Sequence, residues 1–183
     1  VEIIAGSSKL YTGLSTDQAK NITFSGNQGT AVTLAGASSG GTADVLTIDL
    51  ANTTSTREIT VAGAVVSGFE TVNLNASTGT DAGTDSSFTF ATAGDTSAIN
   101  LTGTHDMTVA IDSSKSTGVT FTSTSTGEVT LTGNVAKAST LTTGSGGDNI
   151  TLSTTNGSTY SSGAGNDTFV SAIAGLVATG VDD

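Results

Sequence analysis

The sequence predicts an all-β protein, a parallel β-solenoid or β-roll with short strands and a less regular N-terminal part. Apolar residues at alternate positions, typical of strands with one buried face, recur along the second half with most starts 9 to 11 residues apart. The chain has 24 glycines and no proline, which suits many tight turns between short strands. Two copies of a glycine–aspartate nonapeptide near the C-terminus repeat the unit of stacked β-coils.

From residue 88 onward, the apolar positions predict one short strand about every ten residues. They are Phe88/Phe90, Ile99/Leu101, Val109/Ile111, Val119/Phe121, Val129/Leu131, Leu141, Ile150/Leu152, Tyr160 and Phe169. A nonapeptide β-roll places two short strands in each coil of about 18 residues. We therefore expect the solenoid to begin well before the nonapeptides.

The first half is spaced less evenly, so longer loops and sandwich-like packing both fit it. Its apolar positions are Ile22/Phe24, Val32/Leu34, Leu46/Ile48/Leu50, Ile59/Val61 and Val72/Leu74. Residues 15–20 begin like a capping box and predict one short helical turn, and residues 171–178 are a second candidate turn. The pattern predicts three parts. Residues 1–87 form an irregular β-rich part, residues 88–142 form a β-solenoid whose strands recur about every ten residues, and residues 143–183 form a calcium-binding β-roll that continues beyond the fragment.

The charge balance points to cations as partners. Sixteen acidic residues against five basic ones give a net charge of −11, which predicts repulsion from nucleic acid. The chain has no cysteine, which excludes disulfides and thiolate metal sites. No stretch has the length and apolarity of a membrane span, so we expect none.

The nonapeptides occupy residues 143–151 and 162–170, each reading small-Gly-x-Gly-x-Asp-x-apolar-x. The glycines Gly144, Gly146, Gly163 and Gly165 allow sharp turns with accessible carbonyls, and Asp148 and Asp167 add anionic oxygens. Ca²⁺ is bound by six to eight such oxygens. The sequence therefore predicts Ca²⁺ as the cofactor, with a tight turn that holds no metal as the alternative.

The spacing of the two aspartates predicts one site. Asp148 and Asp167 are 19 residues apart, close to one coil of a β-roll, so they should stack on the same side. Residues 154–160 form the opposite turn and contain no aspartate, so we expect that side to bind calcium poorly or not at all. Asp81 and Asp85 lie four residues apart in a glycine-containing loop and form a second candidate, with a solvated acidic loop as its alternative.

Catalytic interpretations are weak. Residues 36–40 match the G-x-S-x-G nucleophile elbow, but that elbow needs a strand-to-helix turn. The sole histidine, His105, is expected in an exposed turn. With Arg57 the sole arginine and four scattered lysines, a basic substrate-binding cluster is hard to assemble. We therefore expect no enzyme.

With these motifs, the chain resembles secreted bacterial proteins of the RTX type. The phrases at residues 42–48, 59–63 and 66–74 look like those of Gram-negative surface-layer proteins of the Caulobacter kind. The resemblance implies a calcium-dependent coat on the bacterial cell surface, exported by type I secretion. Its partners would be other copies in a lattice, other domains of the same chain or cell-surface polysaccharide. Only two clear nonapeptides are present and neither begins with Gly, which implies fewer calcium ions than in a long RTX block.

The leading expectation is thus a structural, extracellular surface-layer segment locked by Ca²⁺. A spacer or binding module of a large RTX adhesin is the second hypothesis. A solenoid enzyme that degrades polysaccharides is the third.

Overall fold

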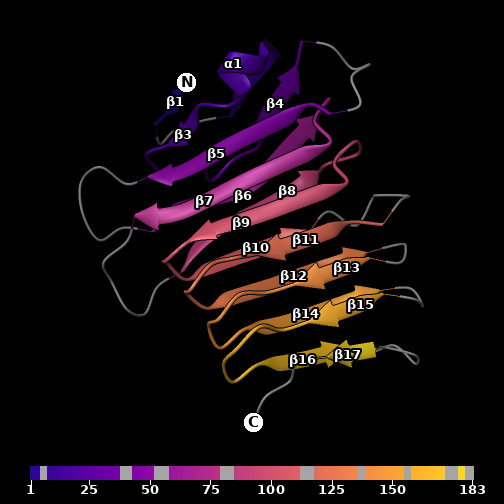
Figure 1. Ribbon diagram of the computed structural model, residues 1–183. Helices are drawn as coiled ribbons and strands as arrows, with labels where there is room; N and C mark the ends of the chain where they lie inside the picture. Colours follow the sequence, from indigo (N-terminus) through magenta and orange to yellow (C-terminus); the bar gives the residue numbers. More distant parts are fainter. Residues whose placement is uncertain are drawn as a thin grey trace.

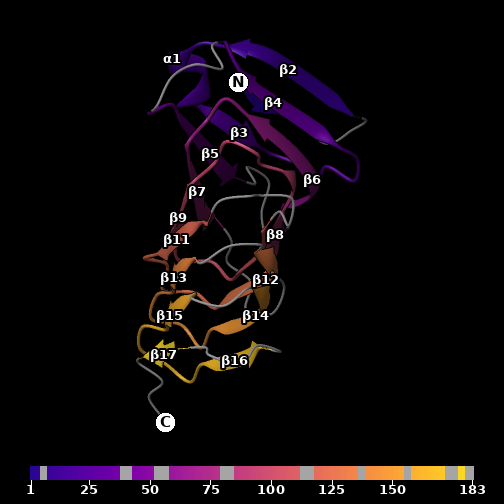
Figure 2. The same cartoon turned by 90° about the vertical axis from the view of Figure 1, so that its right-hand side faces the viewer.

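The chain forms a parallel β-solenoid in which each coil gives one strand to each of two facing sheets, which confirms the predicted fold class. The computed structural model describes residues 1–4, 8–37, 43–51, 58–78, 85–111, 118–135, 139–154, 158–171 and 177–179. Figure 1 shows the strands stacked as rungs from the N-terminal to the C-terminal end. Figure 2, the side view, shows the two sheets side by side and the termini at opposite ends.

Consecutive strands alternate between the sheets, so odd-numbered and even-numbered strands form separate layers. The first sheet contains β1 (Glu2–Ile3), β3 (Ile22–Phe24), β5 (Val45–Ala51), β7 (Thr71–Thr78), β9 (Ala98–Gly103), β11 (Thr120–Ser123), β13 (Thr140–Thr142), β15 (Thr159–Ser161) and β17 (Val177–Thr179). The second contains β2 (Lys9–Leu14), β4 (Val32–Gly36), β6 (Thr60–Ser67), β8 (Ser86–Thr92), β10 (Met107–Ile111), β12 (Val129–Val135), β14 (Asn149–Thr154) and β16 (Thr168–Ser171).

The core consists of apolar columns that run along the solenoid axis. Because side chains alternate between the two faces of a strand, one residue of each predicted apolar pair stacks on its counterpart in the next coil. One column in the first sheet is Leu46, Val72, Ile99, Phe121, Leu141 and Tyr160, all buried. Its counterpart in the second sheet is Phe88, Val109, Leu131, Ile150 and the half-buried Phe169. The ring centroids of Tyr160 and Phe169 are 5.9 Å apart, so the two columns meet.

The N-terminal half belongs to the same two sheets, and the sandwich-like alternative is wrong because its strand pairs are parallel. Its uneven spacing appears instead as register shifts in the β2–β4, β5–β7 and β6–β8 pairs. The predicted capping box is confirmed: Ser15 caps α1 (Thr16–Ala19), and its side chain accepts a hydrogen bond from the Gln18 N–H.

Two features differ from the sequence-based expectations. Residues 171–178 do not form a helical turn where the structure describes them, because Ser171 ends β16 and Val177 begins β17. The edge strands β1 and β2 were not predicted; in β2 the apolar residues do not share one face, because Leu14 is buried and Leu10 is 72% exposed. Both sheets run through all three expected parts of the chain. The expected boundary between residues 87 and 88 lies inside the strand β8. Among the described helices, none has the length and apolarity needed to cross a membrane.

Candidate metal centre

The two nonapeptide turns lie directly on top of each other. The first connects β13 to β14 and the second connects β15 to β16. Both flanking strand pairs are in register, with Leu141 opposite Tyr160 and Asn149 opposite Thr168. The backbone N–H of Asp148 donates a hydrogen bond of 2.8 Å to Oδ1 of Asp167. The two aspartates are therefore one coil apart on the same side, as their spacing predicts.

Asp148 occupies a position that is apolar in the preceding coil. Because Thr130 pairs with Asn149, the residue before each, Val129 and Asp148, also stack. Val129 is fully buried, and the Asp148 side chain is only 1% exposed. Oδ1 of Asp148 accepts a hydrogen bond of 2.8 Å from the Val129 N–H. A core position thus holds a carboxyl group, which is costly to bury unless its oxygens find partners.

Three oxygens in these turns are buried and have no hydrogen-bond partner within the part of the chain that the structure describes. They are Oγ1 of Thr143, Oδ2 of Asp148 and Oδ2 of Asp167. The first two belong to one turn and the third to the turn stacked on it. Buried polar groups in proteins nearly always have a partner, so an unsatisfied group calls for an explanation such as an ion. Two carboxylate oxygens and a hydroxyl are hard ligands of the kind that Ca²⁺ prefers.

The surroundings of Asp148 disfavour its charge. Burial is the largest cause and raises the pKa of Asp148 above its ordinary value of 3.8, and the negative charge of Asp167 raises it further. The Thr143 hydroxyl, which lies against the Asp148 carboxylate without a well-formed hydrogen bond, and the hydrogen bond from the Val129 N–H lower this pKa. A cation placed between the two aspartates would relieve both of the effects that raise this pKa.

The glycines of the motif are required by close approach between coils. A Cβ atom on Gly163 would overlap the carbonyl oxygen of Gly144 in the turn below. Gly165 has a φ of +122°, which L side chains rarely adopt. Gly144 and Gly146 likewise pack against backbone of the preceding turn, at Ser125 and Gly127. The sequence signal at these positions therefore reflects stacking, whether or not the carbonyls bind an ion.

The opposite turns of the same coils use neutral oxygens in a similar ladder. The Val119 N–H donates to Oγ of Ser139 at 2.9 Å, and the Ser139 N–H donates to Oγ of Ser158 at 3.1 Å. Both serines are buried. A hydroxyl in this position satisfies the backbone without placing a charge in the interior. This side therefore lacks the feature that favours a cation at Asp148 and Asp167.

The second candidate pair is not brought together by anything the structure describes. Asp85 is exposed at the start of β8, and its Oδ2 accepts a long hydrogen bond of 3.4 Å from the Thr108 hydroxyl. Asp81 lies outside the described residues. Considering only His, Cys, Asp and Glu of the described ranges, no group of three is placed to hold a metal ion. The arrangement at Asp148 depends on two carboxylates and a hydroxyl, so it is not of that kind.

Sequence reasoning missed two residues. Thr143 stands at the first position of its nonapeptide, where the departure from Gly was the available signal, and its hydroxyl is buried beside Asp148. His105 was expected to be exposed, which is wrong: it is 8% exposed, and its backbone N–H donates to the Ala76 carbonyl at 3.0 Å. Ser38, the serine of the elbow-like sequence, lies outside the described residues.

Comparison of the chain with known families, curated proteins and solved structures finds no match in any of the three.

Proposed function

We propose that this chain is a structural segment of a secreted bacterial surface-layer protein, and that Ca²⁺ bound between its stacked turns fastens the solenoid. The observation that carries the proposal is the set of buried oxygens at Thr143, Asp148 and Asp167 that make no well-formed hydrogen bond within the described part of the chain. The phrases that resemble Gram-negative surface-layer proteins supply the setting. The net charge of −11 suits an environment rich in divalent cations.

These residues fit the proposed ion chemically. The carboxylates of Asp148 and Asp167 and the hydroxyl of Thr143 would bind it, together with backbone carbonyls of residues 144–147 and 163–166. Calcium supplies the positive charge that compensates two carboxylates in a buried position. Since the two aspartates are brought together only in the folded coil, calcium bound there stabilises the folded state and not the unfolded one. Folding is thereby coupled to the calcium concentration outside the cell.

A structural role also agrees with the shape of the molecule. The sheets are long and narrow, with the strands stacked as rungs, as Figures 1 and 2 show. Coils that contact only their neighbours form a rod whose length grows with the number of repeats. Such a rod suits a lattice element, and it equally suits the spacer of an adhesin, so assembly is the property that separates these two functions.

The experiment is to follow assembly of the purified chain in millimolar Ca²⁺, in Mg²⁺ of equal ionic strength and in chelator, by sedimentation velocity and negative-stain electron microscopy. The proposal predicts ordered sheets or fibres in Ca²⁺ alone, and their loss in the double variant Asp148→Asn with Asp167→Asn. Calcium binding without assembly would contradict the surface-layer function and favour the adhesin spacer. Assembly that is equal in chelator would contradict the calcium mechanism.

A further inference from the structure

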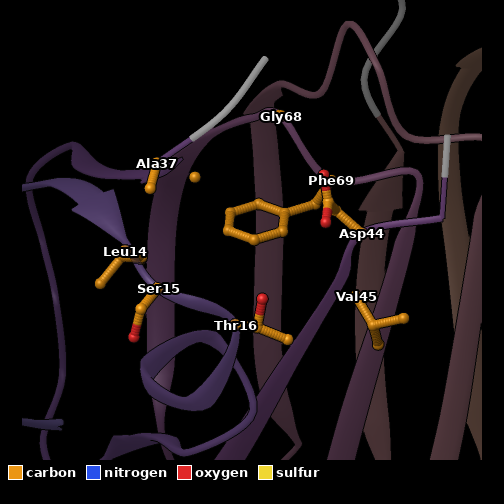
Figure 3. A pocket seen from close by; sticks show the side chains of 9 residues that line it. Leu14, Ser15, Thr16, Ala37, Asp44, Val45, Gly68 and Phe69 are labelled. Carbon is orange, nitrogen blue, oxygen red and sulfur yellow. The ribbon is translucent and has the colours of Figure 1, made fainter. Parts of the chain in front are cut away.

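A cavity lies at the other side of the solenoid, near its N-terminal end, where even-numbered strands turn into odd-numbered ones. Its volume is about 280 Å³, which is room for several water molecules. It is lined by Leu14, Thr16, Ala37, Val45, Phe69 and Asp44, together with backbone of neighbouring turns. Figure 3 shows the Phe69 ring in the middle of this space, the Thr16 hydroxyl directed toward the ring, and Asp44 beside it.

The cavity contains one unsatisfied charged group. Oδ2 of Asp44 is buried and has no hydrogen-bond partner among the residues described. None of the described residues that line the cavity is cationic. Two further carboxylates nearby are already engaged by backbone: the Asp44 N–H donates to Oε2 of Glu70 at 2.7 Å, and the Gly68 N–H donates to Oδ2 of Asp95 at 2.9 Å. Among the described residues that line the cavity, the charge is therefore negative and uncompensated.

The backbone of Asp44 is held in place by its neighbours. The Asp44 carbonyl accepts hydrogen bonds from the N–H groups of Glu70, at 3.0 Å, and Thr71, at 3.2 Å. Together with the hydrogen bond from the Asp44 N–H to Glu70, these contacts hold both the N–H and the carbonyl group of Asp44. The position from which the Asp44 side chain reaches the cavity is therefore well defined.

The aromatic wall is fixed as well. The Phe69 carbonyl accepts a hydrogen bond of 2.9 Å from the Thr96 hydroxyl of the next coil, and the Phe69 side chain is 3% exposed. Gly36 lies against this ring, and a Cβ there would lie 3.4 Å from Phe69 Cζ and 3.0 Å from the Gly68 carbonyl oxygen. The absence of a side chain at Gly36 therefore preserves the space around the ring.

We propose that this cavity binds an alkylammonium group, a protonated amine on a short apolar stem. The ammonium donates to the carboxylate of Asp44, which lines the cavity, in a charge-assisted hydrogen bond. The face of the Phe69 ring attracts the same positive charge, and Leu14, Ala37 and Val45 cover the stem. A metal ion would leave these apolar walls unused, whereas an amine uses both the carboxylate and the walls. The site is separate from the calcium centre at Asp148 and does not depend on it.

The test is a titration of the ¹⁵N-labelled chain with n-butylammonium chloride in Ca²⁺ buffer, followed by the amide resonances of residues 44 and 68–70. We expect saturable shifts with a dissociation constant on the order of 1 mM, as befits so small a ligand. Asp44→Asn keeps the shape of the side chain and should weaken binding about tenfold or more, because it removes a hydrogen bond to a charged group. Asp17→Asn removes an exposed carboxylate of α1 and should leave the affinity unchanged. Thermal melting of both variants confirms that they are folded.

Three outcomes would overturn the proposal. If n-butanol binds as tightly as n-butylammonium, the cavity recognises apolar surface and not charge. If Asp44→Asn binds with unchanged affinity, Asp44 is not the acceptor. If raising the Ca²⁺ concentration displaces the amine, the cavity is a metal site. N-acetyl-lysine methylamide and glucosamine, titrated in the same way, then distinguish a lysine side chain of a protein partner from an amino sugar as the source of the group.

Discussion

Replacement of Asp148 by asparagine tests the calcium centre most directly. The amide oxygen of asparagine can still accept the hydrogen bond that the Val129 N–H now gives to Oδ1 at 2.8 Å. The NH₂ group replaces Oδ2, which has no partner within the described residues, and can donate to the Thr143 hydroxyl oxygen, which lacks one as well. The variant therefore removes the charge and one metal ligand while keeping the ladder that joins the coils.

The expected effect has opposite signs with and without metal. In chelator, Asp148→Asn should be as stable as the original chain or more stable, because a buried, unpaired carboxylate is lost. In Ca²⁺ at 100 times its dissociation constant, the original chain gains about 2.7 kcal/mol. A hundredfold weaker affinity in the variant reduces that gain to about 0.4 kcal/mol. For a chain of this size the difference corresponds to a shift in Tm of roughly 5 to 10 °C.

The assay is differential scanning calorimetry in chelator and over a series of Ca²⁺ concentrations. Asp106→Asn is the matched control, because Oδ1 of Asp106 accepts a hydrogen bond of 2.7 Å from the Glu128 N–H in the same kind of ladder, outside the Asp148–Asp167 pair. The control should keep the full calcium response. The reasoning is refuted if Ca²⁺ leaves the Tm of the original chain unchanged, or if Asp148→Asn and the original chain respond equally.

Two further predictions concern packing and pH. Gly163→Ala should lower the free energy of unfolding by more than about 1 kcal/mol, in chelator as well as in Ca²⁺. The reason is steric, because the new Cβ would overlap the Gly144 carbonyl and the coils must separate. Urea denaturation measures this loss, and a loss confined to Ca²⁺ would contradict the steric explanation. Burial is the largest cause that raises the pKa of Asp148 above 3.8 and that of Glu128 above 4.5. In chelator, the stability that each group contributes is therefore complete at a pH below its ordinary pKa and is lost as the pH rises through its raised pKa in the folded chain. The Tm in chelator should therefore rise as the pH is lowered from 7 toward 4.5, and this rise should be smaller in Asp148→Asn; an equal rise in both would show that other groups govern it.

The strands of the C-terminal half could be predicted from the sequence because their signal is local. Val109 and Ile111, or Ile150 and Leu152, mark one face of a strand, and their regular recurrence predicts coils of similar length. The capping box at Ser15 is equally local, since it involves residues three apart. The helical turn predicted at residues 171–178 is wrong at the described ends of that range, because short apolar runs suit either structure and Val177 and Ala178 pair with β15.

The candidate site could be predicted from the sequence only in part. The 19-residue spacing placed Asp148 above Asp167, since one coil of the roll has nearly that length. It did not reveal that the Thr143 hydroxyl lies beside Asp148, nor that Oδ2 of each aspartate is buried without a hydrogen bond within the described chain, because burial depends on the coils above and below. The exposure of His105 was mispredicted for the same reason: its turn is covered by neighbouring coils.

The sequence by itself determined the repeating parallel architecture, the side of the roll that carries acidic turns, and the absence of cysteine chemistry. These properties depend on residue type and spacing. Alternation along a strand decides which face of the sheet a residue occupies, and a constant coil length decides which residues stack on each other. The tertiary structure alone decided which oxygens lack a partner among the described residues and where a cavity forms beside Asp44 and Phe69. Both depend on contacts between residues of different coils, about 26 positions apart in the case of Asp44 and Glu70, and such distances leave no local pattern in the chain.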